Sequence, residues 1–273
     1  MTTDGMLALH TVRRGRPGAL PLVLLHGFPL DHRMWSDTTD LMAGDPTVLA
    51  PDLPGFGRSP VGEDVAEALG EQGPSIEVMA DAVAATLHAA GVQRAVIAGL
   101  SMGGYVAMAV VERHPALVAG LGLLDTKSTA DPDAARENRL RVADAVLADD
   151  SVDAVLRMRT TLLGATSRVT RPDLVEHLEA WITDQGPRGV AWAQRAMAVR
   201  ADRTAVLGRV HRPALVVVGA EDELTPPDAA RAMAEVLPDA DLVVVPAAGH
   251  MTPIENPEPV AVALGTLLRR SGG

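Results

Sequence analysis

The chain has 273 residues, of which 47% are hydrophobic and 2% aromatic, and its formal charge is −11. This length fits one large α/β domain, or a domain carrying an insertion, better than two independent domains. The negative charge argues against nucleic acids and anionic membranes as partners. Because the chain has no cysteine, disulfides, thiolate catalysis and cysteine-ligated zinc are excluded.

The amino-terminal residues 1–9 lack a basic run followed by a long apolar stretch, so they do not resemble a signal peptide. No uninterrupted apolar run approaches the roughly 18–20 residues that a membrane span requires. We therefore expect a soluble, cytoplasmic protein.

Short apolar runs typical of buried strands alternate with helical patterns along most of the chain. The runs comprise residues 22–25, 48–50, 95–98, 121–124, 215–218 and 242–245. Helical patterns cover residues 76–90 and 102–113. This alternation predicts an α/β fold, with a mostly parallel central sheet and helices on both faces. We also expect an antiparallel edge strand within residues 6–13 and a surface loop at 62–74.

Residues 126–206 interrupt this alternation because they contain no strand-like run and several helical patterns. One helix is expected to start with Asp131 as its N-cap and Pro132 as its first residue, and another near Pro172. The predicted organisation is a core domain of residues 1–125 and 207–273 with a helical cap, residues 126–206, inserted into it.

The segment Gly99-Leu100-Ser101-Met102-Gly103 follows one predicted strand and opens a predicted helix. This is the pattern of a nucleophile elbow, in which a serine on a sharp turn is raised above the sheet. Glycine is needed two residues to either side because larger side chains would collide with the strand and the helix. Ser101 is therefore the predicted nucleophile.

A serine hydroxyl needs a general base, and a histidine base needs an acid to hold its tautomer. His250 and Asp222 each follow a predicted strand, at the sheet edge where parallel-sheet enzymes assemble their sites. We predict His250 as the base and Asp222 as the acid. Asp125, which also follows a predicted strand, is the alternative acid.

Acyl transfer also requires two N–H donors for the developing oxyanion. The backbone N–H groups of Met102, after the nucleophile, and of Phe28, after the first buried strand, are the predicted donors. Pro29 cannot donate. We expect the neighbouring His26 to have a structural role, anchoring this loop by hydrogen bonds.

Five motifs spread over nearly the whole chain carry a family resemblance: HGFPLDHRMW (26–35), DLPGFGRS (52–59), GLSMGGYVA (99–107), GAEDELTPP (219–227) and AGHMTPIENPE (248–258). The chain resembles the α/β-hydrolase superfamily, and within it the 3-oxoadipate enol-lactonases and related esterases. The resemblance implies the chain order nucleophile, acid, histidine, and it implies neither a metal nor an organic cofactor.

We expect an apolar substrate pocket roofed by the cap and lined by large side chains: Met34, Trp35, Trp181, Trp192 and Met251. Such walls disfavour a free carboxylate because of its desolvation. The prediction therefore favours neutral esters or lactones over 3-oxoadipate lactone, whose acid group would need a cation from among Arg33, Arg157 and Arg159.

The predicted function is hydrolysis of a small-molecule carboxylic ester or lactone through an acyl-Ser101 intermediate. Hydrolysis of a C–C bond and perhydrolysis on the same triad are alternatives. A thioesterase serving a carrier protein is another, although the charge of −11 argues against the basic docking patch that it would need. The alternative that is not an enzyme is a ligand-binding protein that keeps the fold without catalytic activity.

Overall fold

The computed structural model describes residues 6–272, in which seven strands form one sheet in the order β1-β3-β2-β4-β5-β6-β7. The strands are β1 (Leu9–Arg13), β2 (Leu22–Leu25), β3 (Val48–Pro51), β4 (Ala95–Leu100), β5 (Val118–Leu124), β6 (Ala214–Gly219) and β7 (Ala240–Val245). Neighbouring strands are parallel except at the edge, where β1 pairs antiparallel with β3. The predicted α/β class is confirmed, and each predicted run contributes a strand.

The strand register brings the carboxyl ends of the central strands to one edge of the sheet. Leu25 of β2 pairs with Gly99 of β4, and Leu100 pairs with Leu124 of β5. Strands β2, β4, β5 and β6 are entirely buried, as their continuous apolar runs require. The loops that begin after these strands therefore start side by side.

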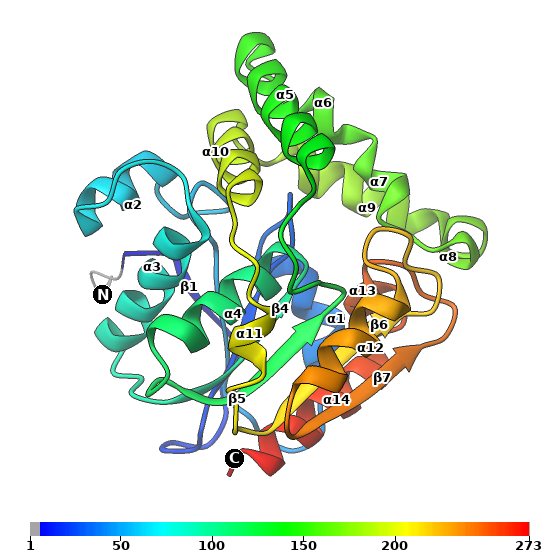
Figure 1. The fold of residues 1–273 in the computed structure, drawn as a ribbon. Helices are drawn as coiled ribbons and strands as arrows, with labels where there is room; N and C mark the ends of the chain where they lie inside the picture. Colours follow the sequence, from blue (N-terminus) through cyan, green and yellow to red (C-terminus); the bar gives the residue numbers. More distant parts are fainter. Residues whose placement is uncertain (1–5, 273) are drawn as a thin grey trace.

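Helices cover both faces of the sheet (Figure 1). One face carries α3 (Ile76–Ala89), α4 (Met102–Arg113), α11 (Thr204–Leu207) and α12 (Pro227–Val236). The other face carries α1 (Ser36–Asp40), α13 (Thr252–Glu255) and α14 (Pro257–Arg270), with the short 3-10 helix η1 (His32–Trp35) beside them. No helix within residues 6–272 is both long and apolar enough to cross a membrane.

Six helices inserted between β5 and β6 form a cap on the side toward which the strand arrows point (Figure 1). They are α5 (Asp133–Asp149), α6 (Asp153–Leu156), α7 (Met158–Thr161), α8 (Ala165–Thr170), α9 (Pro172–Thr183) and α10 (Pro187–Ala198). The next helix, α11, contacts α4 and α12 of the sheet domain. We therefore propose that the cap ends shortly before α11, slightly earlier than residue 206.

Two local predictions were wrong. Helix α5 begins at Asp133 with Pro132 as its N-cap, so Asp131 does not cap it and has a different role described below. Residues 62–69 of the predicted loop form α2 (Gly62–Leu69), which buries Val65 and Ala66 and ends at Gly70 with a φ of 73°. The mixture of glycine and acidic residues concealed this short amphipathic helix.

Close backbone contacts dock the cap on the sheet domain. A Cβ atom on Gly189 of α10 would overlap the backbone of Gly55, in the loop after β3. A Cβ atom on Gly62, at the start of α2, would overlap the indole ring of Trp192 in α10. Since α10 also packs along α5, these contacts hold the cap helices in place over the sheet.

Replacing Gly62 with alanine should destabilise the protein by about 1–3 kcal/mol, because the added methyl group overpacks a rigid indole ring. Urea denaturation monitored by circular dichroism would measure the loss. Gly186→Ala is the matched control, since its Cβ would meet no atom within 4 Å and its φ is −76°. Equal stability of the two variants would contradict the proposed docking contact.

Candidate active site

Ser101 occupies the sharp turn between β4 and α4, with a φ of 53° and a ψ of −112°. This conformation is strained for a residue other than glycine. A Cβ atom on Gly99 would overlap the backbone of Gly103, and one on Gly103 would overlap the backbone of Leu25. The glycine spacing therefore has the steric cause that the sequence suggested, and Ser101 stands at the carboxyl edge of the sheet.

His250 lies on the loop after β7, and its Nδ1 is 2.8 Å from Asp222 Oδ2. Asp222 also accepts hydrogen bonds from the Thr225 hydroxyl, at 2.7 Å, and from the N–H groups of Leu224 and Thr225. Burial alone would raise the pKa of the Asp222 carboxyl, but the charge and hydrogen bond of His250 and the bonds from Thr225 lower it. An ionised Asp222 holds the proton on Nδ1 and leaves the His250 Nε2 lone pair free.

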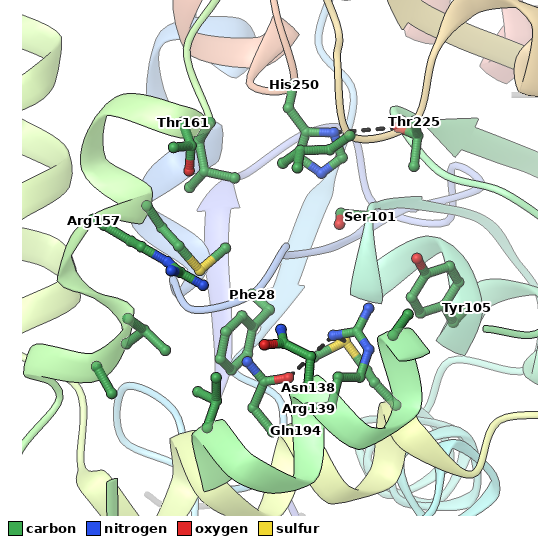
Figure 2. A pocket seen from close by; sticks show the side chains of 18 of the residues that line it. Phe28, Ser101, Tyr105, Asn138, Arg139, Arg157, Thr161, Gln194, Thr225 and His250 are labelled. Carbon is green, nitrogen blue, oxygen red and sulfur yellow. Dashed lines mark hydrogen bonds between the residues drawn. The ribbon is translucent and has the colours of Figure 1, made fainter. Parts of the chain in front are cut away.

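Ser101 and His250 open onto the same cavity, of about 270 Å³ (Figure 2). Figure 2 also shows the contact of 3.2 Å between Thr225 Oγ1 and His250 Nδ1, which adds a second restraint on the ring. Among the hydrogen bonds of residues 6–272, none joins the Ser101 hydroxyl to His250. In a site without substrate this catalytic bond is often long and shortens when substrate binds.

Asp125, the alternative acid, has other partners. Its Oδ1 accepts the Gly219 N–H at 2.9 Å, and its Oδ2 lies 2.5 Å from the Thr252 hydroxyl. Complete burial, and then the charge of Asp222, raise the pKa of Asp125 well above its ordinary value of 3.8. Of the two candidate acids, the structure therefore brings Asp222 and not Asp125 to the imidazole.

The two predicted oxyanion donors flank the nucleophile. Met102 is the first residue of α4, and Phe28, on the loop after β2, lines the cavity. Within the described residues 6–272, neither backbone N–H forms a hydrogen bond with another protein group. Both are therefore available to an oxygen atom bound next to Ser101.

His26 anchors the loop after β2 by hydrogen bonds. Its Nε2 accepts the Leu53 N–H at 2.8 Å, and its Nδ1 bonds to the Gly27 carbonyl at 3.1 Å. Burial lowers the pKa of His26, so the ring is neutral, donating from Nδ1 and accepting at Nε2. This geometry matches the structural role expected for His26.

The large apolar side chains expected in the pocket lie elsewhere, which corrects that prediction. Met34, Trp35 and Met251 are buried in the core under the site, and the Met34 sulfur accepts the Gly27 N–H. Trp192 packs against α2, and the half-buried Trp181 stacks on His177 and lies 5.9 Å from the Arg33 guanidinium. The strong apolar character of these residues marks packing positions rather than a substrate surface.

The observed cavity wall comes from both domains. The sheet domain contributes Phe28, Ser101, Tyr105, Leu224, Thr225 and His250. Helix α5 contributes Ala135, Asn138, Arg139 and Val142, and its neighbours add Lys127, Arg157 and Gln194. The four α5 residues have the spacing i, i+3, i+4 and i+7, which places them on one helix face.

Only Arg157, of the three arginines considered for an acidic substrate, reaches the cavity. Arg33 forms an ion pair with Asp31 at 2.7 Å. Arg159 pairs with Glu179 at 3.2 Å. Sequence reasoning missed the other two cavity cations, Lys127 and Arg139, because nothing local indicates which cap residues face inward.

The one group of potential metal ligands found within residues 6–272 lies outside this cavity. His10 Nε2 and His32 Nδ1 each lie 2.8 Å from a different oxygen of Asp52. Their rings stack at 3.4 Å with an interplanar angle of 7°. The nitrogen lone pairs of stacked rings lie in parallel planes and do not converge on one ion. This cluster therefore links β1, η1 and the loop after β3 through the carboxylate.

The family model for the alpha/beta hydrolase fold matches residues 21–257, so the chain belongs to this family. It is 31% identical to a pimeloyl-[acyl-carrier protein] methyl ester esterase of Aromatoleum aromaticum, over 91% of this chain and 98% of that protein. It is 32% identical to the dihydrolipoyllysine-residue acetyltransferase component of the Pseudomonas putida acetoin cleaving system, over 94% of this chain, and spans 65% of that protein's length.

Solved structures give the same fold. A thermophilic esterase from Thermogutta terrifontis, with malate bound, has a TM-score of 0.88 and 36% identity, covering 98% of this chain and 94% of that one. An enol-lactonase from Burkholderia xenovorans LB400 has a TM-score of 0.79 and 24% identity, covering 96% of both chains. The resemblance stated from the sequence motifs is thereby confirmed at the level of the fold family.

The raised pKa of Asp125 predicts how its stability contribution depends on pH. A carboxyl that keeps its proton in the folded state stabilises the protein below the unfolded pKa of about 3.8 and loses this effect as the pH rises. Relative to Asp125→Asn, the wild type should therefore lose stability from about pH 4 upward. Urea denaturation of both proteins across this range tests the prediction, and a pH-independent difference would contradict it.

Proposed function

We propose that this protein is a serine hydrolase that cleaves a carboxylic ester or lactone through an acyl-Ser101 intermediate. The observation that carries the proposal is that Ser101, on its strained turn, and His250, oriented by Asp222, open onto one cavity. The free N–H groups of Phe28, on the loop after β2, and of Met102, at the start of α4, lie beside the nucleophile. These groups are the full set that acyl transfer to a hydroxyl requires.

In the first half-reaction, Ser101 Oγ attacks the carbonyl carbon while His250 Nε2 takes its proton. The carbonyl oxygen becomes an oxyanion and accepts hydrogen bonds from the N–H groups of Phe28 and Met102. Asp222 stabilises the imidazolium that forms. The intermediate then collapses, the C–O bond to the alcohol breaks, and His250 returns the proton to the leaving oxygen.

In the second half-reaction, a water molecule attacks the acyl-serine carbonyl and His250 takes its proton. Collapse of this intermediate releases the carboxylic acid and returns the proton to Ser101. With a lactone, alcohol and acid remain in one molecule and the product is a hydroxy acid. No step draws on a group beyond the protein, the substrate and water.

The comparisons support an ester or lactone as substrate. Relatives of about 30% identity include a methyl ester esterase and a protein named as a putative carbamate hydrolase, and the most similar of the solved structures reported above is an esterase. Hydrolysis of a C–C bond or perhydrolysis would use the same residues, but no contact in the cavity favours either one.

Ser101 should be the site of covalent modification by a fluorophosphonate probe. The probe's phosphorus is attacked by an activated serine and leaves a mass increment that tryptic mass spectrometry locates. Ser101→Ala and His250→Ala should each abolish labelling and lower p-nitrophenyl ester turnover by about 10⁴-fold or more. Labelling that persists in Ser101→Ala, or no turnover by the wild type, would favour a different nucleophile or the ligand-binding alternative.

Asp222→Asn should lower kcat by about 10⁴-fold, because an amide supports the wrong tautomer of His250. Asp125→Asn should retain turnover within a few-fold, because Asp125 contacts Gly219 and Thr252 and not the imidazole. Circular dichroism of both variants controls for folding. Loss of activity in Asp125→Asn with retention in Asp222→Asn would reverse the assignment of the acid.

A further inference from the structure

Three cationic side chains line the cavity, and no carboxylate does among the described residues. Lys127 precedes α5, Arg139 lies on α5, and Arg157 lies between α6 and α7. Figure 2 shows the guanidinium groups of Arg139 and Arg157 reaching into the cavity from the cap, while Ser101 and His250 lie on the sheet side. Arg139 and Arg157 therefore face the proposed nucleophile from across the cavity.

The positive charge at this wall exceeds the negative charge that balances it. Asp131 is shared by Arg200 Nη1 at 2.5 Å, Arg139 Nε at 2.6 Å and Lys127 Nζ at 3.2 Å. Burial would raise the pKa of Asp131, but the hydrogen bonds from Arg200 and the charge of Arg139 hold it well below its ordinary value. One ionised carboxylate thus balances one of three cations, which leaves two positive charges in excess.

Arg157 adds a further positive charge to the same cavity. Within residues 6–272, no carboxylate oxygen lies within 4 Å of its guanidinium, whereas Arg159, two residues away, pairs with Glu179. The polar side chains of Asn138 and Gln194 also line this part of the wall. Both the charge and the hydrogen-bond donors are therefore concentrated on one side of the cavity.

This concentration is opposite in sign to the protein as a whole, whose formal charge is −11. Like charges gathered in a partly enclosed cavity repel one another, and the field that they produce is focused there. A bound anion relieves this repulsion, whereas a neutral ligand does not. The arrangement therefore favours a negatively charged group, and planar guanidinium groups match the geometry of a carboxylate.

We infer that Lys127, Arg139 and Arg157 form a carboxylate subsite, and that the substrate is an ester or lactone bearing a free carboxylate remote from the bond that is cleaved. This inference rests on the proposed function, because the acyl group must reach Ser101 while the carboxylate reaches the cap. Val142, Ala154 and Met158 line the cavity too and suit the short carbon chain between the two groups. The substrate class differs from the neutral esters that the sequence favoured.

The test compares two p-nitrophenyl esters of equal chain length, the monoester of glutaric acid and the ester of valeric acid. The wild type should have a kcat/KM about 10- to 100-fold higher for the glutarate monoester, mainly through KM, as expected for a hydrogen-bonded ion pair. The ratio of the two kcat/KM values should fall as salt is added. Equal values for the two esters would overturn the subsite.

Substitutions of the cavity cations then test which residues form the carboxylate subsite. Arg157→Gln and Lys127→Gln should each lower the ratio by about tenfold, and Arg157→Lys should keep part of it. Arg159→Gln is the matched control, because Arg159 is paired outside the cavity, and should leave the ratio unchanged. A ratio that is high in the wild type but unaffected by both cavity variants would overturn the assignment to these residues.

Binding to the inactive protein separates the subsite from the proposed reaction. Titration calorimetry of Ser101→Ala with monomethyl glutarate and with methyl valerate should show tighter binding of the acid, weakened by Arg157→Gln. If the wild type hydrolyses the valerate ester through Ser101 but does not prefer the glutarate monoester, the carboxylate subsite is overturned and the proposed function stands. Tight binding of the acid without turnover of either ester by the wild type would overturn the proposed function alone.

Discussion

At the β4–α4 turn the backbone of Gly103 lies against that of Leu25, so no side chain fits there or at Gly99. This contact forces the chain through the strained conformation at Ser101, with a φ of 53°. It also brings the end of β4 against the loop that carries Phe28. Because the parallel strands end in register, the loops that carry Asp222 and His250 begin at the same edge. The site depends on this close packing of backbone.

Three buried carboxylates near His250 have different roles because each accepts hydrogen bonds from different groups. Asp222 accepts from His250 and Thr225, which keeps it ionised. Asp125 is enclosed and sits near the charge of Asp222, which keeps its proton bound. Glu255 accepts the N–H groups of Gly249 and Met251, on either side of His250, and that of Gly164 in the cap. The histidine loop and the cap are therefore held by one carboxylate, which couples their positions.

Under the proposed function, the sheet domain carries out the chemistry and the cap selects the substrate. The sheet domain contributes Ser101, His250 and the N–H groups of Phe28 and Met102, which we propose bind the oxyanion. The cap contributes Lys127, Arg139 and Arg157, so changes to residues on α5 and its neighbours should direct the same chemistry to another substrate. Substitutions in the cap should therefore change the selectivity for substrates more than they change the rate of the reaction itself.

Local patterns determined the strands, the strained turn and the residues proposed for catalysis, because each is marked by a signal within a few residues: an apolar run, a glycine spacing, a polar residue at a strand end. Only the tertiary structure decided which side chains face the cavity. Trp35 and Arg139 illustrate the difference, since the first is buried in the core and the second lines the wall. The sequence favoured Asp222 over Asp125, but only the tertiary structure shows that Asp222 contacts the imidazole of His250 and that Asp125 contacts Gly219 instead. The physical reason is that the direction of a side chain depends on how helices and loops distant in the chain pack together, and no local pattern records that packing.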